Sequence, residues 1–185
     1  FAVLDALELG QIVLVGHSYG TWVVLAAAAA RPQRVAQLIL VDPPIDCTQS
    51  SPDVFASQIE PMQAAMEGQG WRSVLRQSFR QALMGGTPDT HADILARLDQ
   101  TSEAALRGTS RELFTFPALE VLDTYLAAPK ADVHIILAAS EAMPCSLHVL
   151  RPALTTTTIP DTGHWLMLDA PEAFAQALNS CLTTG

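Results

Sequence analysis

The chain has 185 residues, of which 49% are hydrophobic and 16% are charged. This length and apolar content indicate one globular domain with a buried core and exclude a disordered chain. The 19 acidic and 10 basic side chains leave a formal net charge of −9, which argues against a nucleic-acid partner and against binding to an anionic membrane surface.

Cysteine usage and hydrophobic runs narrow the class of protein further. The three cysteines are widely spaced and form no CxxC pair or Cys/His cluster, so neither a disulfide framework nor a metal site is indicated. The longest apolar run, over 21–30, is far shorter than the roughly 20 residues that a membrane-spanning helix needs. We therefore expect a cytoplasmic protein with reduced thiols and no membrane span.

The chain begins with a segment that reads as the end of an amphipathic helix. Phe1, Leu4 and Leu7 share one face of this helix over residues 1–10, and Gly10 stands where a helix would end. The chain is thus expected to start inside a helix, which bears on the family resemblance described below.

A βαβ unit follows. Residues 11–16 and 37–41 are short β-branched runs that are typical of buried parallel strands. The alanine-rich segment 21–30 between them favours a helix that packs closely on a sheet. Two parallel strands joined by one helix form a right-handed unit.

The middle of the chain, residues 43–129, contains no convincing strand and is predicted to form several amphipathic helices. Apolar residues at helical spacing predict one helix over 71–83 and a second around 94–98. A third helix is predicted to begin near Pro117.

Two strands, a loop and a helix complete the chain. Residues 133–138 are apolar and β-branched, and the threonine-rich run 154–159 has high β propensity. The loop 160–164 follows. The last helix is predicted to start near Asp169, with Glu172 three residues on and Pro171 in the first turn, which resembles a capping box. The predicted fold is therefore α/β, with roughly four parallel strands and flanking helices.

The sequence GHSYG at residues 16–20 fits the G-x-S-x-G pattern of a nucleophile elbow. Such an elbow is a sharp strand-to-helix turn that holds a strained serine with its hydroxyl exposed at the top of the sheet. A strand is predicted to end at Gly16 and a helix to begin after Ser18, as the motif requires. Ser18 is therefore the candidate nucleophile.

A serine nucleophile needs a base, and His164 is the best candidate among five histidines. It lies in a glycine-containing loop between a predicted strand and the last helix. His17 is inside the elbow but is expected to face away from the serine, into the fold. His134, within a strand, is expected to be a core residue. His91 lies among the helices of the middle region, and His148 follows the third strand without a loop motif that would aim it.

A third group must orient the imidazole and stabilise its charged form, and two carboxylates compete for this role. Asp42 follows the second predicted strand and Glu141 follows the third. Both would lie at the carboxyl edge of the sheet, where open α/β sheets place their sites. Asp42 is preferred because two prolines end its strand sharply. Glu141 stays open as the alternative acid, with Asp46 and the turn-forming Asp161 as weaker candidates.

With these motifs, the chain resembles the α/β-hydrolase family over nearly its whole length. The resemblance is carried by LVGHSYG at 14–20, LILVDPP at 38–44 and IPDTGHW at 159–165. The order serine, aspartate, histidine along the chain matches the order of nucleophile, acid and base in that family. Most members place the acid after the penultimate strand, where this chain has Glu141 and no aspartate. A subset places it one strand earlier, as at Asp42.

The resemblance implies a core domain over 1–44 and 116–185 and a helical cap over 45–115. Such a cap shapes a substrate pocket and excludes water. The aromatic side chains that could line this pocket, or could equally pack within the helical layer, are Trp71, Phe79, Phe114, Phe116 and Trp165.

The implied function is that of a serine hydrolase that acts on a carboxylic ester or similar small acyl compound through an acyl-enzyme, without metal or organic cofactor. Relatives with the same fold also include C–C bond hydrolases, lyases and cofactor-free dioxygenases. A non-catalytic protein that binds a small ligand is a further alternative, because the fold alone does not select a function.

Complete members of the family have a much longer segment before the elbow than the 17 residues that precede Ser18 here. The resemblance therefore implies an N-terminally truncated member, in which the strand over 11–16 exposes an apolar edge. The backbone N–H of Tyr19 would supply one donor of the oxyanion hole, and the second would be missing. We expect the isolated 185 residues to be weakly active or inactive.

Overall fold

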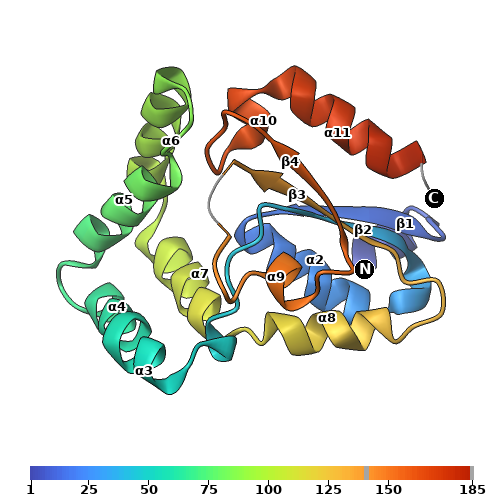
Figure 1. Cartoon of the computed structure of the whole chain (residues 1–185), viewed down its shortest axis with the longest axis horizontal. Coiled ribbons are helices and arrows are strands. Elements are labelled where there is room, and N and C mark those ends of the chain that lie inside the picture. Colours follow the sequence, from blue (N-terminus) through green and yellow to red (C-terminus); the bar gives the residue numbers. More distant parts are fainter. Residues whose placement is uncertain (140–141, 184–185) are drawn as a thin grey trace.

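The sheet of the protein has four parallel strands in the order β1-β2-β3-β4. It is seen in a computed structural model that describes residues 1–139 and 142–183 (Figure 1). The strands are β1 (Ile12–His17), β2 (Val35–Val41), β3 (Val133–Ala138) and β4 (Thr155–Ile159). This sheet confirms the predicted α/β fold and the predicted position of each strand to within about two residues.

Helices cover both faces of the sheet, and the alternation of side chains along β2 explains why. Leu38 and Leu40 point to the face covered by α2 (Tyr19–Ala30) and α8 (Ala118–Leu126). Ile39 and Val41 point to the opposite face, which α10 (Leu166–Asp169) and α11 (Pro171–Thr183) cover (Figure 1). A strand that is apolar on both faces has to lie inside such a three-layer arrangement.

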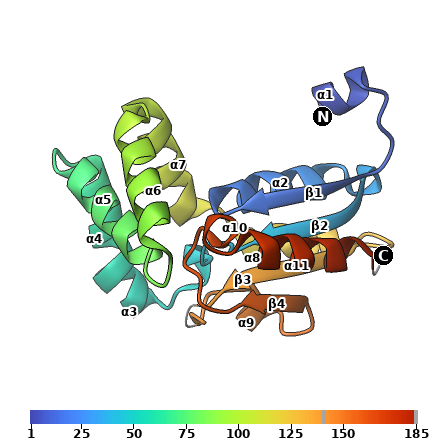
Figure 2. The same ribbon diagram turned by 90° about the horizontal axis from the view of Figure 1, so that it is seen from above.

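A separate layer of helices lies beyond the carboxyl ends of the strands, as Figure 2 shows. We call this segment, 52–115, the helical layer. It has a small core of its own around Trp71, Leu75 and Leu98. Its elements are α3 (Pro52–Val54), a π-helix (Phe55–Ile59), α4 (Glu60–Glu67), α5 (Trp71–Ala82), α6 (Pro88–Gln100) and α7 (Glu103–Thr115). The helices predicted around 71–83 and 94–98 and the one beginning near Pro117 are confirmed as α5, α6 and α8.

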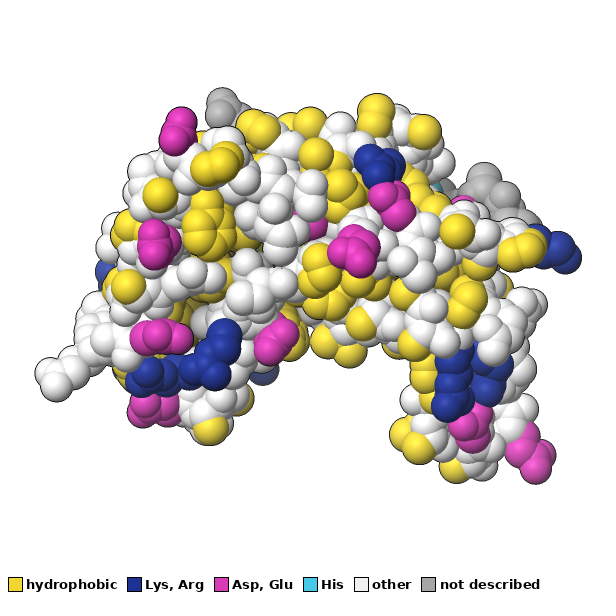
Figure 3. All heavy atoms as spheres, turned by 90° about the horizontal axis from the view of Figure 1, so that it is seen from below, with side chains coloured by type: hydrophobic (Ala, Val, Ile, Leu, Met, Phe, Trp, Pro, Cys, Tyr) yellow, Lys and Arg dark blue, Asp and Glu magenta, His cyan; other side chains and the backbone are white. Residues whose placement is uncertain are grey.

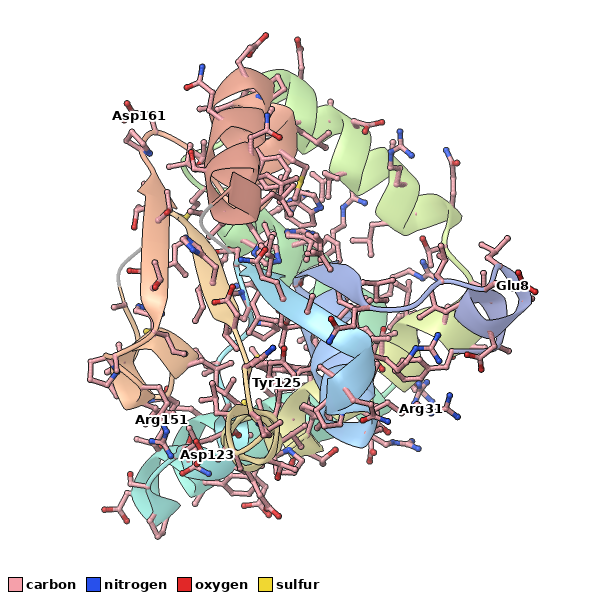
Figure 4. All side chains as sticks on the ribbon, turned by 90° about the vertical axis from the view of Figure 1, so that its right-hand side faces the viewer. Glu8, Arg31, Asp123, Tyr125, Arg151 and Asp161 are labelled. Atoms are coloured by element: carbon pink, nitrogen blue, oxygen red, sulfur yellow. The ribbon has the colours of Figure 1, made fainter. Side chains whose placement is uncertain are left out.

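The remaining elements are short. They are α1 (Ala2–Ala6), α9 (Leu147–Leu150) and the 3-10 turns Pro32–Arg34 and Cys47–Gln49. Asp123 of α8 and Arg151 after α9 point toward each other in Figure 4 and form an ion pair. This pair links α8 to the segment that precedes β4.

The helix expected over residues 1–10 is wrong in its length. It ends at Ala6, and Glu8 follows with a positive φ of 54°, so Gly10 does not end it. None of its residues is buried, and Leu7 is 62% exposed. An apolar helix face that is only partly buried gains little free energy from burial, so it does not extend the helix.

The first strand was predicted to be buried, and this is wrong within the described part of the chain. β1 forms the edge of the sheet, and Val13 and Val15 are 38% and 45% exposed. The apolar edge expected from the family resemblance is therefore observed. In Figure 3 the outline of the molecule is hollowed between the helical layer and α1, and hydrophobic side chains border the hollow.

The capping box predicted at the start of the last helix is also wrong. Asp169 ends the short helix α10, and α11 begins only at Pro171. The Asp169 carboxylate accepts hydrogen bonds from backbone N–H groups outside both helices. Its true partners are described below.

Candidate active site

The candidate nucleophile lies in a strained turn between β1 and α2. Ser18 has φ 52° and ψ −127°, a backbone conformation that non-glycine residues rarely adopt. Its N–H donates to the carbonyl of Val41 at 3.0 Å, and its carbonyl accepts from the Thr21 hydroxyl at 2.5 Å. A Cβ on Gly16 would stand 2.4 Å from the Gly20 carbonyl oxygen. The first glycine of the motif is therefore required by the close approach of strand and helix.

His164 and Asp42 form the central contact of the site. The His164 Nδ1–H donates to Asp42 Oδ2 at 2.5 Å, and Ala138 N–H donates to Asp42 Oδ1 at 3.0 Å. Because the proton lies on Nδ1, Nε2 is free to accept a proton. The side chains of His164 and Asp42 are 18% and 15% exposed, so water screens their interaction only weakly.

The backbone arrangement brings these two residues and Ser18 to the same edge of the sheet. Ser18 follows β1, Asp42 follows β2, and His164 lies in the loop after β4. The carbonyl that binds the Ser18 N–H belongs to Val41, the residue before Asp42. The three predicted residues therefore gather where the carboxyl ends of the strands meet.

His17 does not simply face into the fold, as predicted, but packs against His164. Its Nε2–H donates to the His164 carbonyl at 2.8 Å, and the two rings lie 4.7 Å apart. Burial and the neighbouring His164 lower the pKa of His17 to about 4. His17 is thus a neutral hydrogen-bond donor at pH 7, and it fixes the backbone of the residue that carries the candidate base.

The other candidate acids fall in different places. Glu141 lies outside the described residues. Asp46 is completely buried, and its carboxylate accepts from the Thr48 backbone and hydroxyl and from the Leu119 N–H at 2.7 Å. These bonds attach the loop after β2 to the start of α8, which is a structural role. Asp161 is exposed with φ 57°, in agreement with its predicted role in a turn.

Of the remaining three histidines, His134 and His91 have hydrogen-bond partners of their own. The Nε2 atom of His134 lies 2.9 Å from the Thr157 hydroxyl of the neighbouring strand, and that of His91 lies 2.5 Å from the Leu83 carbonyl. His148 Nδ1 is buried without a hydrogen-bond partner among the described residues, and burial lowers the pKa of this histidine.

The aromatic candidates divide into two groups. Trp71 is buried in the core of the helical layer, and Phe116 stacks on Trp22 at 5.4 Å, so both pack within the fold. Phe79 of α5 lies 5.4 Å from the Trp165 ring, which in turn lies edge-on to His164 at 5.0 Å. Phe79 and Trp165 thus connect the helical layer with the candidate base.

Phe114, the fifth aromatic candidate, lines a cavity of about 320 Å³ between the helical layer and the loop after β2. Most of the lining side chains are apolar, and they include Ile45, Ile59, Met62, Leu75 and Leu113.

One polar donor for a developing anion is available beside Ser18. Tyr19 is the first residue of α2, so its N–H has no acceptor within the helix. The positive end of the helix dipole also favours negative charge at this point. In the described residues, no group of three or more His, Cys, Asp and Glu side chains could hold a metal ion. Their helices include none that is long and apolar enough to cross a membrane.

The sequence of the chain matches a known family over most of its length. A profile described as "Alpha/beta hydrolase family" matches residues 1–177. The chain belongs to the α/β-hydrolase family. This confirms the resemblance drawn from the elbow, the strand before Asp42 and the histidine loop.

Two curated lipases are similar to this α/β hydrolase. Lipase LipV of Mycobacterium tuberculosis is 50% identical over 44 residues, which are 24% of this chain and 17% of that protein. The sn-1-specific diacylglycerol lipase ABHD11 of Danio rerio is 23% identical over an alignment 193 residues long, which covers 95% of this chain and 58% of that protein. The chain therefore spans less than two thirds of either curated relative.

The fold also matches solved structures. A hydrolase from Oleispira antarctica superposes with a TM-score of 0.72 at 17% identity, over 97% of this chain and 68% of that chain. At this identity the likeness shows the fold alone.

Proposed function

We propose that the protein is a serine hydrolase of carboxylic esters or similar acyl compounds, with Ser18 as nucleophile, His164 as base and Asp42 as the orienting acid. The observation that carries this proposal is the 2.5 Å bond between His164 Nδ1 and Asp42 Oδ2, which leaves the Nε2 atom of His164 without a proton. The Ala138 N–H, which holds the other oxygen of Asp42, also supports Asp42 as the acid.

The proposed reaction has two stages. His164 Nε2 takes the proton of the Ser18 hydroxyl as the oxygen attacks the acyl carbon, and the Tyr19 N–H stabilises the oxyanion. The leaving alcohol takes the proton from His164 as the ester bond breaks. Water then hydrolyses the acyl-Ser18 ester with His164 again as base, which releases the carboxylic acid.

We further propose that the helical layer acts as the cap of this site. The 320 Å³ cavity is lined by Pro44 and Ile45, which follow Asp42 closely in the chain, and its apolar lining supports an apolar acyl group as substrate. The contact of Phe79 with Trp165 supports the same role, because it places a side chain of the layer next to the residue that follows the base. The substrate proposed is therefore a small apolar ester.

The test is a stopped-flow experiment with p-nitrophenyl butyrate. We expect a burst of nitrophenolate, followed by turnover, and both should be lost in Ser18→Ala, with kcat lower by about 10⁴-fold or more. Ser73→Ala is the matched control because Ser73 is exposed on α5. Turnover that persists in Ser18→Ala would contradict the acyl-enzyme, and ligand binding without any turnover would point to a non-catalytic protein.

A further inference from the structure

The carboxylate of Asp169 joins two segments that are far apart in the sequence. Its Oδ2 accepts from the N–H of Gly163, the residue before the candidate base, at 2.9 Å. Its Oδ1 accepts from the N–H of Thr87 at 2.9 Å. Thr87 is the N-cap of α6, and its hydroxyl in turn accepts from the Thr90 N–H. One side chain thus links the histidine loop to the helical layer.

The histidine loop and the helical layer are also closely packed against each other. A Cβ on Gly163 would stand 3.0 Å from the Leu83 carbonyl oxygen and from the Gly86 nitrogen. A Cβ on Gly86 would stand 2.7 Å from Asp169 Oδ2. Both glycines are therefore needed for the turn between α5 and α6, residues 83–87, to lie directly on the histidine loop and its carboxylate.

The backbone of the candidate base is held in the same region. The His164 N–H donates to the carbonyl of Ala82, at the end of α5, at 3.0 Å. With the bond from His17 to its carbonyl, every backbone polar group of His164 is fixed. Two residues of the helical layer therefore hold the histidine loop. Ala82 binds it directly, and Thr87 is joined to it through the carboxylate of Asp169.

We propose that Asp169 is a positioning residue for His164, which sets the imidazole between Asp42 and Ser18 and ties this position to the placement of the helical layer. The proposal rests on the proposed function for its catalytic consequence. Gly163 is buried, so its N–H cannot turn to water when the carboxylate is lost. The loop has to shift to satisfy that group, and the imidazole shifts with it.

The perturbation is Asp169→Asn, which keeps the size of the side chain. An amide has one acceptor oxygen and one NH₂ donor, so in either orientation one of the two backbone N–H groups faces another donor. We expect kcat for p-nitrophenyl butyrate to fall by about 10- to 100-fold, because a small misplacement of a catalytic group has effects of this size. KM should change little, since no substrate contact is removed.

The matched control is Asp161→Asn. It removes the same charge from the same loop, and Asp161 is exposed at the turn after β4, where Figure 4 shows its side chain pointing away from the fold. Its φ of 57° is also accepted by asparagine. The control should therefore keep the kcat of the wild type, and an equal loss in both variants would overturn the proposal in favour of a general charge effect.

A readout that does not depend on turnover is the Nδ1 proton of His164 in ¹⁵N-histidine-labelled protein. Its downfield NMR signal should shift upfield or broaden in Asp169→Asn and stay unchanged in Asp161→Asn. A folded Asp169→Asn with kcat within twofold of the wild type, or with an unchanged Nδ1 signal, overturns the proposal.

If Asp169→Asn does not fold, a second variant tests the proposal. Gly86→Ala keeps the carboxylate and its charge but crowds it from the side of the helical layer, and it should lower kcat and move the Nδ1 signal in the same direction. Wild-type values in this variant overturn the proposal. Because only weak turnover is expected from these 185 residues, loss of even the Ser18-dependent nitrophenolate burst in the wild type is the result that refutes the proposed function. The Nδ1 signal then decides on Asp169 by itself.

Discussion

The bond between Asp42 and His164 makes a specific prediction for Asp42→Asn. Both oxygens of Asp42 accept, one from Ala138 N–H and one from His164 Nδ1–H. An amide that keeps the bond from Ala138 presents its NH₂ to His164. The imidazole can then satisfy this donor only with an unprotonated Nδ1, so its proton moves to Nε2, the atom that has to receive the proton of Ser18.

The expected magnitude follows from the two functions that are lost together. The imidazole has the wrong tautomer, and the imidazolium that forms during attack has no buried negative partner. A change of this kind lowers kcat by about 10³- to 10⁴-fold, which corresponds to an increase of about 4–5 kcal/mol in activation free energy. Stability should change by only about 1 kcal/mol, because every hydrogen bond of the pair has a replacement.

The fold should tolerate this substitution for a second reason. Asp42 has a φ of 43°, and asparagine is one of the few residues that adopt a positive φ at low cost. A loss of activity with an intact structure is therefore the expected combination. Circular dichroism melting should show a shift of only a few degrees, since about 1 kcal/mol moves the melting temperature of a chain this long by about 2–4 °C.

The assay compares kcat for p-nitrophenyl butyrate in Asp42→Asn and Glu141→Gln, with the imidazole tautomer read from ¹⁵N chemical shifts. We expect the first variant to be inactive with the proton on Nε2, and the second to resemble the wild type. The reasoning is refuted if Asp42→Asn keeps kcat within tenfold of the wild type. A large loss in Glu141→Gln instead would assign the acid to the third strand.

Two further predictions concern the elbow and its neighbour. Gly16→Ala should lower the free energy of unfolding in urea by about 1–3 kcal/mol, because the added Cβ would overlap the Gly20 carbonyl. The control is Gly20→Ala, since no atom lies within 4 Å of a Cβ added there. Equal losses of stability in the two variants would contradict this explanation. The pKa of His17 is lowered from 6.5 to about 4 in the folded protein, so the unfolded chain binds the proton more tightly. The contribution of His17 to the free energy of unfolding is therefore complete above pH 6.5 and is lost as the pH falls toward 4. Its loss should reduce the free energy of unfolding by up to about 3 kcal/mol over that range, and an equal pH dependence in His17→Gln would exclude His17 as its source.

The strands and the elbow could be predicted from the sequence because their signals are local. An apolar β-branched run such as the one ending at Val41 indicates a strand, but its place in the sheet decides whether it is buried, as the exposed edge strand β1 shows. Gly16 is required by its close contacts with Gly20 and Val24 of the helix that follows. The pairing of Asp42 with His164 spans 122 residues. It could be predicted only because the carboxyl ends of parallel strands meet at one edge.

The supports of the histidine loop could not be predicted in the same way. Asp169 binds backbone N–H groups, one of them 82 residues away, and backbone groups leave no trace in side-chain patterns. The role of His17 depends on burial against a loop that arrives 147 residues later. The predicted length of α1 was wrong for a related reason, since helical periodicity does not tell whether a core is present for Leu7 to pack against.

The register of the sheet explains how the strained residues are held in place. Ser18 and Asp42 both have positive φ angles and both directly follow strands, and each donates its N–H to the next strand, to Val41 and to Ile136 respectively. Strain of this kind costs about 1–3 kcal/mol at each residue and persists only where the surroundings fix the backbone. β2 supplies that constraint, because its side chains from Leu38 to Val41 are almost fully buried. A slip of β2 by one residue would exchange its two apolar faces and break the backbone bonds that hold Ser18 and Asp42, so the core that stabilises the fold also positions the candidate nucleophile and acid.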